Sequence, residues 1–467
     1  MSVLDTCRHL HFMGIGGAGM SGLAELLVHC GYTVTGCDVR RSAITDRLEA
    51  LGVRVRIGHG VDHASSTEAV VISSAIPIDN EELVAARDRG CQIIRRAELL
   101  GAVMTGTKGI AIAGTHGKST TTTMIGAILE AAGWDPTVLV GGRIRGQDGN
   151  VRLGAGKWFV AEADEFDRSF LALEPDYAVI TNIEPDHLDT YTSSDQVDAA
   201  FAQFAARVRD HGTLVLGIDD PGVRRLEPPT GLGVVTFGFS SNAEVRGSEI
   251  EPRQLDTRFE MRLPDGHRQD VEVSLPGRHN VLNALAAAAM GWSLGLEPEI
   301  LAAGLSSVRG VERRFEIVYE DEDVMIVDDY AHHPTEVAAT LASARTGWPG
   351  RRLVAVFQPH LYSRTRDFAS QFGIALADAD VVFVTDVYPA REAPIAGVSG
   401  RLVCDAVKRA GADDVTYVEN GSVSDTVAAR LTDGDLVVTL GAGDVDRVAR
   451  RLAEERRAGG RGSHGSD

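Results

Sequence analysis

Lysine supplies very little of the positive charge of this 467-residue chain. Four lysines stand among 46 basic residues, at Lys108, Lys118, Lys157 and Lys408. With 66 acidic residues the formal net charge is −20, which excludes the broad basic face that a nucleic-acid backbone requires. An anionic ligand must therefore be held by a few cations placed at one point.

Cysteines are few and scattered, and apolar runs are short. The five cysteines form no C-x-x-C pair, so their spacing gives no disulfide framework or metal motif and favours a reducing, cytoplasmic location. The N-terminus leads directly into a predicted strand, so no secretory signal is expected. No apolar run reaches membrane-spanning length, so no membrane insertion is expected.

The remaining composition and the length predict a multidomain α/β protein. Hydrophobic residues make up 44% and charged residues 24%, which is ordinary for globular proteins, and this length suits about three domains. Short apolar runs alternate with amphipathic stretches, except for a β-rich excursion at 236–275. We predict a Rossmann-like N-terminal sheet (1–104), a P-loop ATPase central domain (105–312), a Rossmann-like C-terminal domain (313–455) and a disordered tail (456–467).

A glycine-rich run between a predicted strand and a predicted helix is the strongest functional signal. It reads Gly114-Thr115-His116-Gly117-Lys118-Ser119-Thr120. In this layout backbone N–H groups face phosphates, Lys118 adds a charge, and the Ser119 hydroxyl can bind Mg²⁺. Ile112 replaces the first glycine of the common P-loop spacing. The alternative, a glycine-rich helix start without a ligand, is weaker because strand, loop, lysine, hydroxyl and helix agree.

A second glycine loop lies near the N-terminus. Gly14-Ile15-Gly16-Gly17-Ala18-Gly19 follows a predicted strand, and Asp38 stands close to where a ribose-binding acid belongs. The pattern requires only a diphosphate at a helix N-terminus, so NAD, FAD and UDP all satisfy it. The ATP site downstream disfavours a hydride-transfer enzyme, although an oxidoreductase stays an alternative. Residues Ser73, Ser74 and Ala75, at another strand end, would line the same crevice.

Polar side chains follow two strands of the predicted central sheet. Glu162 ends one strand and His187 follows another, and such strand ends meet at one edge of a parallel sheet. Both are candidate ligands for a divalent cation, although Mg²⁺ prefers oxygen and His187 alone is equally well interpreted as structural. Asn280, at a predicted helix start, is either an N-cap or a base-contacting residue.

Several motifs in one order resemble the Mur ligases of bacterial peptidoglycan synthesis. The resemblance covers nearly the whole chain, and its order is more specific than any single motif. The motifs are Gly14–Gly22, Gly114–Lys118, Glu162–Glu165, Thr181–Asp189, Gly277–Asn280, Arg313–Glu316, Asp328–Pro334 and Gln358–Thr365.

The resemblance implies a role for each motif. The residues expected to bind the UDP-sugar are Gly14, Gly16, Gly17, Gly19, Met20, Ser21, Asp38, Ser73, Ser74 and Ala75. ATP binding falls on Gly114, Thr115, His116, Gly117, Lys118, Ser119, Thr120, Asn283, Arg314 and Asp329. The expected metal ligands are Ser119, Glu162 and His187. The residues expected to line the amino-acid side are Tyr330, His332, Arg364 and Arg366. Direct catalytic roles fall on Lys118, His187, Arg314 and His332, the last as a candidate base.

The resemblance also implies an activity. We expect ATP-dependent ligation of L-alanine to the lactyl carboxylate of UDP-N-acetylmuramate through an acyl phosphate, with Mg²⁺ or alternatively Mn²⁺, by a monomer or homodimer. A recycling ligase that takes a preformed murein tripeptide shares most of these motifs and stays an alternative. A nucleotide-binding regulator without catalysis is a further alternative.

Overall fold

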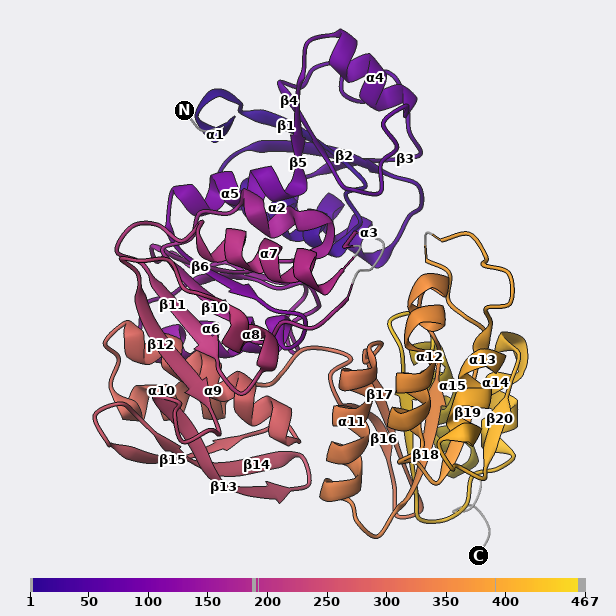
Figure 1. The fold of residues 1–467 in the computed structure, drawn as a ribbon. Helices are drawn as coiled ribbons and strands as arrows, with labels where there is room; N and C mark the ends of the chain where they lie inside the picture. Colours follow the sequence, from indigo (N-terminus) through magenta and orange to yellow (C-terminus); the bar gives the residue numbers. More distant parts are fainter. Residues whose placement is uncertain (1–2, 187–189, 192, 391, 461–467) are drawn as a thin grey trace, which may run out of the picture.

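Three α/β units follow one another along the chain (Figure 1). The computed structural model describes residues 3–186, 190–191, 193–390 and 392–460. The first unit sits on one end of the central unit, and the third unit lies beside the central unit. This arrangement confirms the predicted fold class. Among the described residues, no helix combines the length and the apolar character needed to cross a bilayer.

The first unit is a five-stranded parallel sheet with the order β3-β2-β1-β4-β5. The strand order reverses between β1 and β4, and ligands of such sheets bind at that point, beyond the carboxyl ends of the strands. Its strands are β1 (His9–Met13), β2 (Thr33–Asp38), β3 (Arg54–Ile57), β4 (Ala69–Ile72) and β5 (Gln92–Arg95); its helices are α1 (Val3–Thr6), α2 (Ala18–His29), α3 (Ala43–Ala50), α4 (Glu81–Asp88) and α5 (Arg96–Thr105).

Alternation along β1 determines which helix covers which face of this sheet. Leu10 and Phe12 belong to a core cluster that includes the buried residues of α2. Met13 points to the opposite face, where it packs with Leu83 of α4. Because successive strand residues point to opposite faces, a run of apolar residues is buried on both sides.

The central unit is built on a ten-stranded sheet in which β6, the strand before the P-loop, lies between β10 and β9. The predicted β-rich excursion forms antiparallel β13, β14 and β15. Its strands are β6 (Lys108–Ala113), β7 (Thr137–Leu139), β8 (Val151–Arg152), β9 (Trp158–Glu162), β10 (Tyr177–Ile180), β11 (Thr213–Gly217), β12 (Gly233–Gly238), β13 (Val245–Arg253), β14 (Asp256–Arg262) and β15 (Arg268–Val273); its helices are α6 (Lys118–Ala131), η1 (Phe166–Ala172), α7 (Ser194–Ala205), α8 (Pro221–Arg225), α9 (Arg278–Ser293) and α10 (Pro298–Ser307).

The third unit has six strands in the order β16-β17-β21-β18-β19-β20. Among the described strands, only the β16–β17 pair is antiparallel. Our sequence analysis did not predict β16, although its central residues Ile317, Val318 and Tyr319 favour a strand. Its elements are β16 (Glu316–Glu320), β17 (Val324–Asp329), α11 (Pro334–Gly347), β18 (Arg352–Phe357), α12 (Tyr362–Leu376), β19 (Val381–Val384), α13 (Gly400–Arg409), β20 (Val415–Tyr417), η2 (Asn420–Ser422), α14 (Val423–Ala428), β21 (Asp435–Leu440) and α15 (Asp446–Gly460).

The prediction of a disordered tail from residue 456 is wrong for its first five residues. Helix α15 continues to Gly460, and Arg457 donates a hydrogen bond to the Val318 carbonyl (2.8 Å) while lying over the Tyr319 ring. These contacts with β16 hold the last turn, and an arginine-rich sequence does not reveal them. Residues 461–467 lie outside the described residues. The expected boundaries near 104 and 312 stay predictions; they fall at the end of α5 and between α10 and β16.

Candidate active site

The run 114–120 forms a tight turn from β6 into α6. Gly114 has φ +137° and Gly117 has φ +83°, in a region that glycine adopts without strain. A Cβ at Gly114 would lie 2.0 Å from Thr181 Oγ1, and one at Gly117 would lie 2.3 Å from Asn283 Oδ1. Both positions therefore require glycine, and the start of α6 directs its unpaired N–H groups toward this turn.

The end of β10 fixes the conformation of this loop. Asn182 accepts a hydrogen bond from the His116 amide (2.8 Å) and donates one to the His116 carbonyl (3.1 Å). Thr181 Oγ1 also donates to that carbonyl (2.6 Å). The loop is thus held in one shape by the protein itself, as preorganised phosphate binding requires.

Lys118 lies within a ring of oxygen atoms. Its Nζ donates to the Gly114 carbonyl (2.7 Å) and to Glu165 Oε2 (2.7 Å), and it lies 4.0 Å from Asp164 Oδ1. Burial by itself lowers the pKa of Lys118, but the charges of Glu165 and Asp164 outweigh it and raise that pKa above its ordinary value. Lys118 is therefore a permanent cation at the base of the loop.

Glu162, at the end of β9, faces the start of α6. Its Oε1 accepts a hydrogen bond from the Gly141 amide (2.6 Å). Burial raises the pKa of Glu162, while the Gly141 amide, the Ser119 hydroxyl and Lys118 act against that rise. A hydroxyl and a carboxylate are the hard oxygen ligands that suit Mg²⁺, so Ser119 and Glu162 fit the predicted metal. The third predicted ligand, His187, lies outside the described residues.

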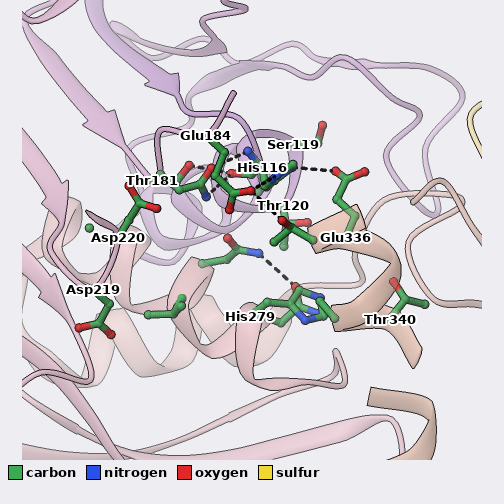
Figure 2. Close-up of a pocket in the computed structure, with 18 of the residues that line it drawn as sticks. His116, Ser119, Thr120, Thr181, Glu184, Asp219, Asp220, His279, Glu336 and Thr340 are labelled. Atoms are coloured by element: carbon green, nitrogen blue, oxygen red, sulfur yellow. Dashed lines mark hydrogen bonds and ion pairs between the residues drawn. The ribbon is translucent and has the colours of Figure 1, made fainter. Parts of the chain in front are cut away.

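A cavity of about 320 Å³ opens beside the loop. Figure 2 shows its lining side chains approaching from the central unit and from α11 of the third unit. Several predicted ATP-site residues meet here, namely His116, Gly117, Ser119, Thr120, Asn283, Arg314 and Asp329. The volume lies at the lower end of the range for ligand pockets, about 300–1,000 Å³.

Two asparagines on α9 line the cavity next to the loop. Asn283 Nδ2 donates to Asn280 Oδ1 (3.2 Å), and Asn280 Nδ2 donates to the Pro276 carbonyl (2.7 Å). The N-cap of α9 is Gly277, so the N-cap interpretation of Asn280 is wrong. Each amide keeps further hydrogen-bonding capacity, and both residues line the cavity.

Arg314 and Asp329 reach the cavity from the third unit. Asp329 accepts hydrogen bonds from the amides of Phe315 (2.7 Å) and Ala331 (2.8 Å). Burial raises the pKa of Asp329 to about 6, although Arg314 acts in the opposite direction. Arg314 lies over the Tyr330 ring and 3.6 Å from Glu336 Oε1. The sequence separates these residues from the P-loop by about two hundred positions, and the fold brings them to one cavity.

A polar cluster joins the P-loop to the third unit. His116 Nδ1 lies 3.3 Å from Glu336 Oε1, and His116 Nε2 lies 3.6 Å from Glu184 Oε2. Thr335 donates to Glu184 across the same interface (2.6 Å). Burial by itself lowers the pKa of His116, but the two carboxylates outweigh it and raise that pKa to about 9. His116 is therefore protonated at neutral pH and bridges two units.

Of the residues predicted for the amino-acid side, three approach the interface and one does not. Arg364 forms a buried, bidentate ion pair with Asp186 of the central unit (2.7 and 2.9 Å). His332 Nδ1 lies 2.9 Å from the Tyr330 carbonyl, and burial lowers the pKa of His332 to about 3. Arg366 instead pairs with Asp367 on an exposed side of α12.

The predicted UDP-sugar residues gather at the point where the first sheet reverses its strand order. The Gly16 amide donates to Asp38 Oδ2 (2.9 Å), and a Cβ at Gly14, whose φ is +78°, would lie 3.3 Å from Ser73 Oγ. The loop that ends at Gly17 and the segment that runs from Ser73 through Ser74 to Ala75 therefore lie side by side, and Gly19 stands in the first turn of α2. Helix α2 begins with Gly17 as its N-cap, which is a geometry that binds phosphate.

Met20 and Ser21 are buried rather than directed into this crevice. The Ser21 hydroxyl donates to the Ala18 carbonyl (3.0 Å), and Met20 belongs to the core. The Ala18 carbonyl also accepts a hydrogen bond from Asn150 of the central unit (2.7 Å). In this structure these two side chains support the helix start and leave its backbone to face a ligand.

Glu165, Glu184 and Glu336 form contacts that our sequence analysis assigned to no site. Glu165 holds Lys118, and the other two hold His116. The sequence signals that could have identified these three residues are weak. Glu165 and Glu184 lie within motifs that follow strands, and Glu336 stands in the first turn of a helix that begins with Pro334. Acidic residues are common at helix starts, so this position alone does not indicate a site.

Three family models match the chain in order. They are the Mur ligase family catalytic domain (9–108), the Mur ligase middle domain (112–291) and the Mur ligase glutamate ligase domain (313–443). Curated relatives include the UDP-N-acetylmuramate–L-alanine ligases of Xanthomonas campestris pv. campestris strain B100 and of Geotalea daltonii. The first is 46% identical over 96% of this chain and 95% of its own length, and the second is 44% identical over 96% and 98%.

Solved structures give the same grouping. The UDP-N-acetylmuramate-alanine ligase of Thermotoga maritima aligns with a TM-score of 0.82 at 29% identity, covering 97% of this chain and 99% of that one. A murein peptide ligase from Psychrobacter arcticus shares the fold, with a TM-score of 0.70 at 24% identity over 95% and 98% of the two chains. The full-length identity above 40% and the matched order of domains show that this chain belongs to the Mur ligase family.

Proposed function

We propose that the chain joins L-alanine to the lactyl carboxylate of UDP-N-acetylmuramate, driven by ATP, in the synthesis of peptidoglycan precursors. One observation carries the proposal: the P-loop of the central unit and Arg314 and Asp329 of the third unit line a single cavity. The curated alanine ligases, similar over 96% of this chain, support the substrate assignment.

The first step activates a carboxylate, which by itself is a poor acylating agent. A lactyl carboxylate oxygen attacks the γ-phosphorus of ATP, ADP leaves, and an acyl phosphate forms. Lys118 and the N–H groups at the start of α6 neutralise and position the phosphates, and Arg314 supplies a second cation from the opposite side of the cavity. These cations come from two units, so the units must be docked for the step to proceed.

The second step forms the amide. The neutral amine of L-alanine attacks the acyl carbonyl, the bond to the phosphate oxygen breaks, inorganic phosphate leaves, and the nitrogen loses a proton. Enclosure by the third unit protects the acyl phosphate from water. Arg364 and Tyr330 lie on this side of the interface, and we assign the amino-acid side to them.

His332 is our candidate for the group that takes the proton. Its Nδ1 faces the Tyr330 carbonyl at 2.9 Å, and a carbonyl only accepts, so Nδ1 carries the hydrogen and Nε2 keeps its lone pair. Because burial lowers the pKa of His332 to about 3, the ring is neutral at physiological pH. Nε2 is therefore available to accept a proton, but a ring with so low a pKa is a weak base, so the pKa of His332 must rise when the substrates are bound for the ring to act as the base.

Ser119 and Glu162 would hold Mg²⁺, with His187 as the third predicted ligand and Mn²⁺ as the alternative ion. When bound, the ion supplies positive charge against the phosphate oxygens. The hydroxyl of Ser119 and the carboxylate of Glu162 face each other at the start of α6, so the chain's own contribution is to orient both oxygens toward the same edge of the sheet.

The substrate assignment is tested by phosphate release from ATP with UDP-N-acetylmuramate and either L-alanine or the murein tripeptide. We expect turnover with L-alanine; turnover with the tripeptide alone would identify the recycling ligase. Arg314→Ala should retain UDP-sugar binding and lose turnover, since its cation is required only at the phosphoryl step. Normal turnover by that variant would refute the assigned role of the third unit.

Location and assembly complete the proposal. Cysteine usage supports the cytoplasm, because the five cysteines are free, three of them buried. The assembly is a monomer or a homodimer, and light scattering of the purified full chain distinguishes the two.

A further inference from the structure

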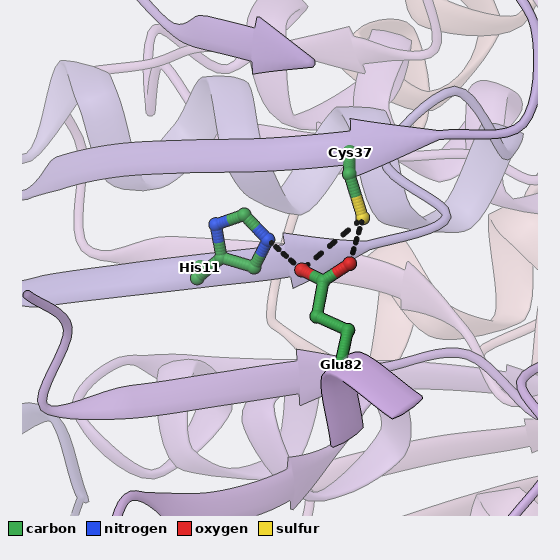
Figure 3. Close-up of side chains that lie close together, drawn as sticks. All are labelled: His11, Cys37 and Glu82. Carbon is green, nitrogen blue, oxygen red and sulfur yellow. Dashed lines mark hydrogen bonds and ion pairs between the residues drawn. The ribbon is translucent and has the colours of Figure 1, made fainter. Parts of the chain in front are cut away.

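A group of metal-binding side chain types lies in the first unit, away from the cavity at the P-loop. Figure 3 shows His11 on β1, Cys37 on β2 and Glu82 on α4 directed toward one another. Their exposed fractions are 1%, 0% and 0%. Two further histidines, His59 and His63, approach Glu82 from the segment between β3 and β4.

The spacing of these atoms suits a single small ion. Cys37 Sγ lies 3.3 Å from Glu82 Oε2 and 3.4 Å from His59 Nδ1, and His59 Nδ1 lies 3.2 Å from Glu82 Oε2. A tetrahedral zinc ion with bonds of about 2.0–2.3 Å places its ligand atoms about 3.2–3.6 Å apart. His11 Nε2 lies closer to Glu82 Oε1, at 2.7 Å. The distance between these two atoms would increase by about half an ångström when an ion is bound.

Two buried ring nitrogens in this group face the Glu82 carboxylate. His11 Nε2 lies 2.7 Å from Glu82 Oε1, and His63 Nδ1 lies 3.4 Å from Glu82 Oε2. The other ring nitrogen of His11 lies 2.9 Å from Thr35 Oγ1, a contact that orients the ring. Metal-bound histidines characteristically hold their second nitrogen in this way. The Nε2 atom of His11 is thus oriented toward Glu82 and the centre of the group.

Charge balance favours a divalent ion of the zinc class. A divalent ion would balance one thiolate and one carboxylate. Imidazole and thiolate ligands select zinc over magnesium, which prefers oxygen.

We propose that His11, Cys37, Glu82 and His59 bind one zinc-class divalent ion, with His63 beside them. The side chains of His59 and His63 are 23% and 13% exposed, and they provide the path from solvent. The ion would act structurally, because the Cys37 carbonyl accepts hydrogen bonds from the amides of Gly14 and Ile15 (2.9 and 3.0 Å). It would thereby fix the start of the N-terminal glycine loop.

Cobalt titration of the chelator-stripped full chain tests this site. We expect one equivalent of Co²⁺ to give a thiolate-to-cobalt charge-transfer band that zinc then removes. Cys37→Ser should abolish the band, and Cys30→Ser, at an exposed cysteine of the same unit, should retain it. The predicted ATP-site metal ligands contain no sulfur, so cobalt bound there gives no such band. Absence of the band in the native chain, or its persistence in Cys37→Ser, overturns the proposal.

A second variant tests the site without changing the fully buried Cys37, whose replacement could prevent folding. His59→Asn alters a partly exposed ligand and should weaken zinc binding, measured by competition with a chelating dye, by at least about tenfold. Zinc should raise the thermal midpoint of the native chain and raise that of His59→Asn less at the same concentration. Equal affinities and equal shifts would refute the assignment. Neither readout uses ligase turnover, so the result is independent of the proposed function.

Discussion

The bridge formed by His116 makes the stability of the interface between the central and third units depend on pH. His116 lies between Glu184 of the central unit and Glu336 of the third unit. We consider the replacement His116→Asn, which keeps a small polar side chain and removes the titrating ring. The variant should lose the attraction between one cation and two carboxylates at every pH at which the native ring is protonated.

The sign and size of this effect follow from the pKa of His116. That pKa rises from an ordinary 6.5 to about 9, because the two carboxylates outweigh burial. The stabilisation is therefore fully present below pH 6.5 and is lost as the pH rises through about 9. One pKa unit corresponds to about 1.4 kcal/mol, so the shift amounts to about 3 kcal/mol.

Urea unfolding at pH 6 and at pH 9.5 measures this dependence. Tryptophan fluorescence suits the assay, because Trp348 belongs to the third unit and Trp134, Trp158 and Trp292 belong to the central unit. The native chain should exceed His116→Asn in stability by about 3 kcal/mol more at pH 6 than at pH 9.5. Comparing the two proteins at each pH cancels the other titrating groups. A difference that does not change with pH would refute the reasoning.

Two further predictions concern the loop and the interface. Gly117→Ala should weaken ATP binding at least about tenfold, since its Cβ would lie 2.3 Å from a side-chain oxygen. The control Gly133→Ala has φ +74° and open space around it, so it should lose only about 1–2 kcal/mol of folding stability to backbone strain and should keep its ATP affinity. Isothermal titration measures both affinities, and equal values would contradict this prediction. Arg364→Met should destabilise the interface by about 3–5 kcal/mol in denaturant unfolding, because it removes the buried cation that pairs with Asp186. Arg345→Met instead breaks an exposed ion pair and should cost at most about 1 kcal/mol in the same assay. Similar losses in these two arginine variants would show that burial of the Arg364 pair does not determine its strength.

Local sequence was sufficient for many of the elements and for the two glycine loops. The short apolar runs that led us to predict alternating strands and helices include β1, β18 and β19. Each is an apolar run bounded by turn residues, and its conformation depends mainly on neighbours in the chain. For the same reason a phosphate-binding turn could be predicted at Gly114–Thr120, since its strand, glycines and helix start are consecutive.

Only the tertiary structure decided which distant side chains meet. His116 and Glu336 are 220 residues apart, and Asp186 and Arg364 are 178 apart. The group formed by His11, Cys37 and Glu82 likewise comes from two strands and a helix, with no common spacing in the sequence. Periodicity indicates which face of an element is buried but not which partner covers it, because that depends on strand order and on how the units dock. The sequence therefore determined the local geometry that can bind phosphate, whereas the docking of three units determined the charges around it.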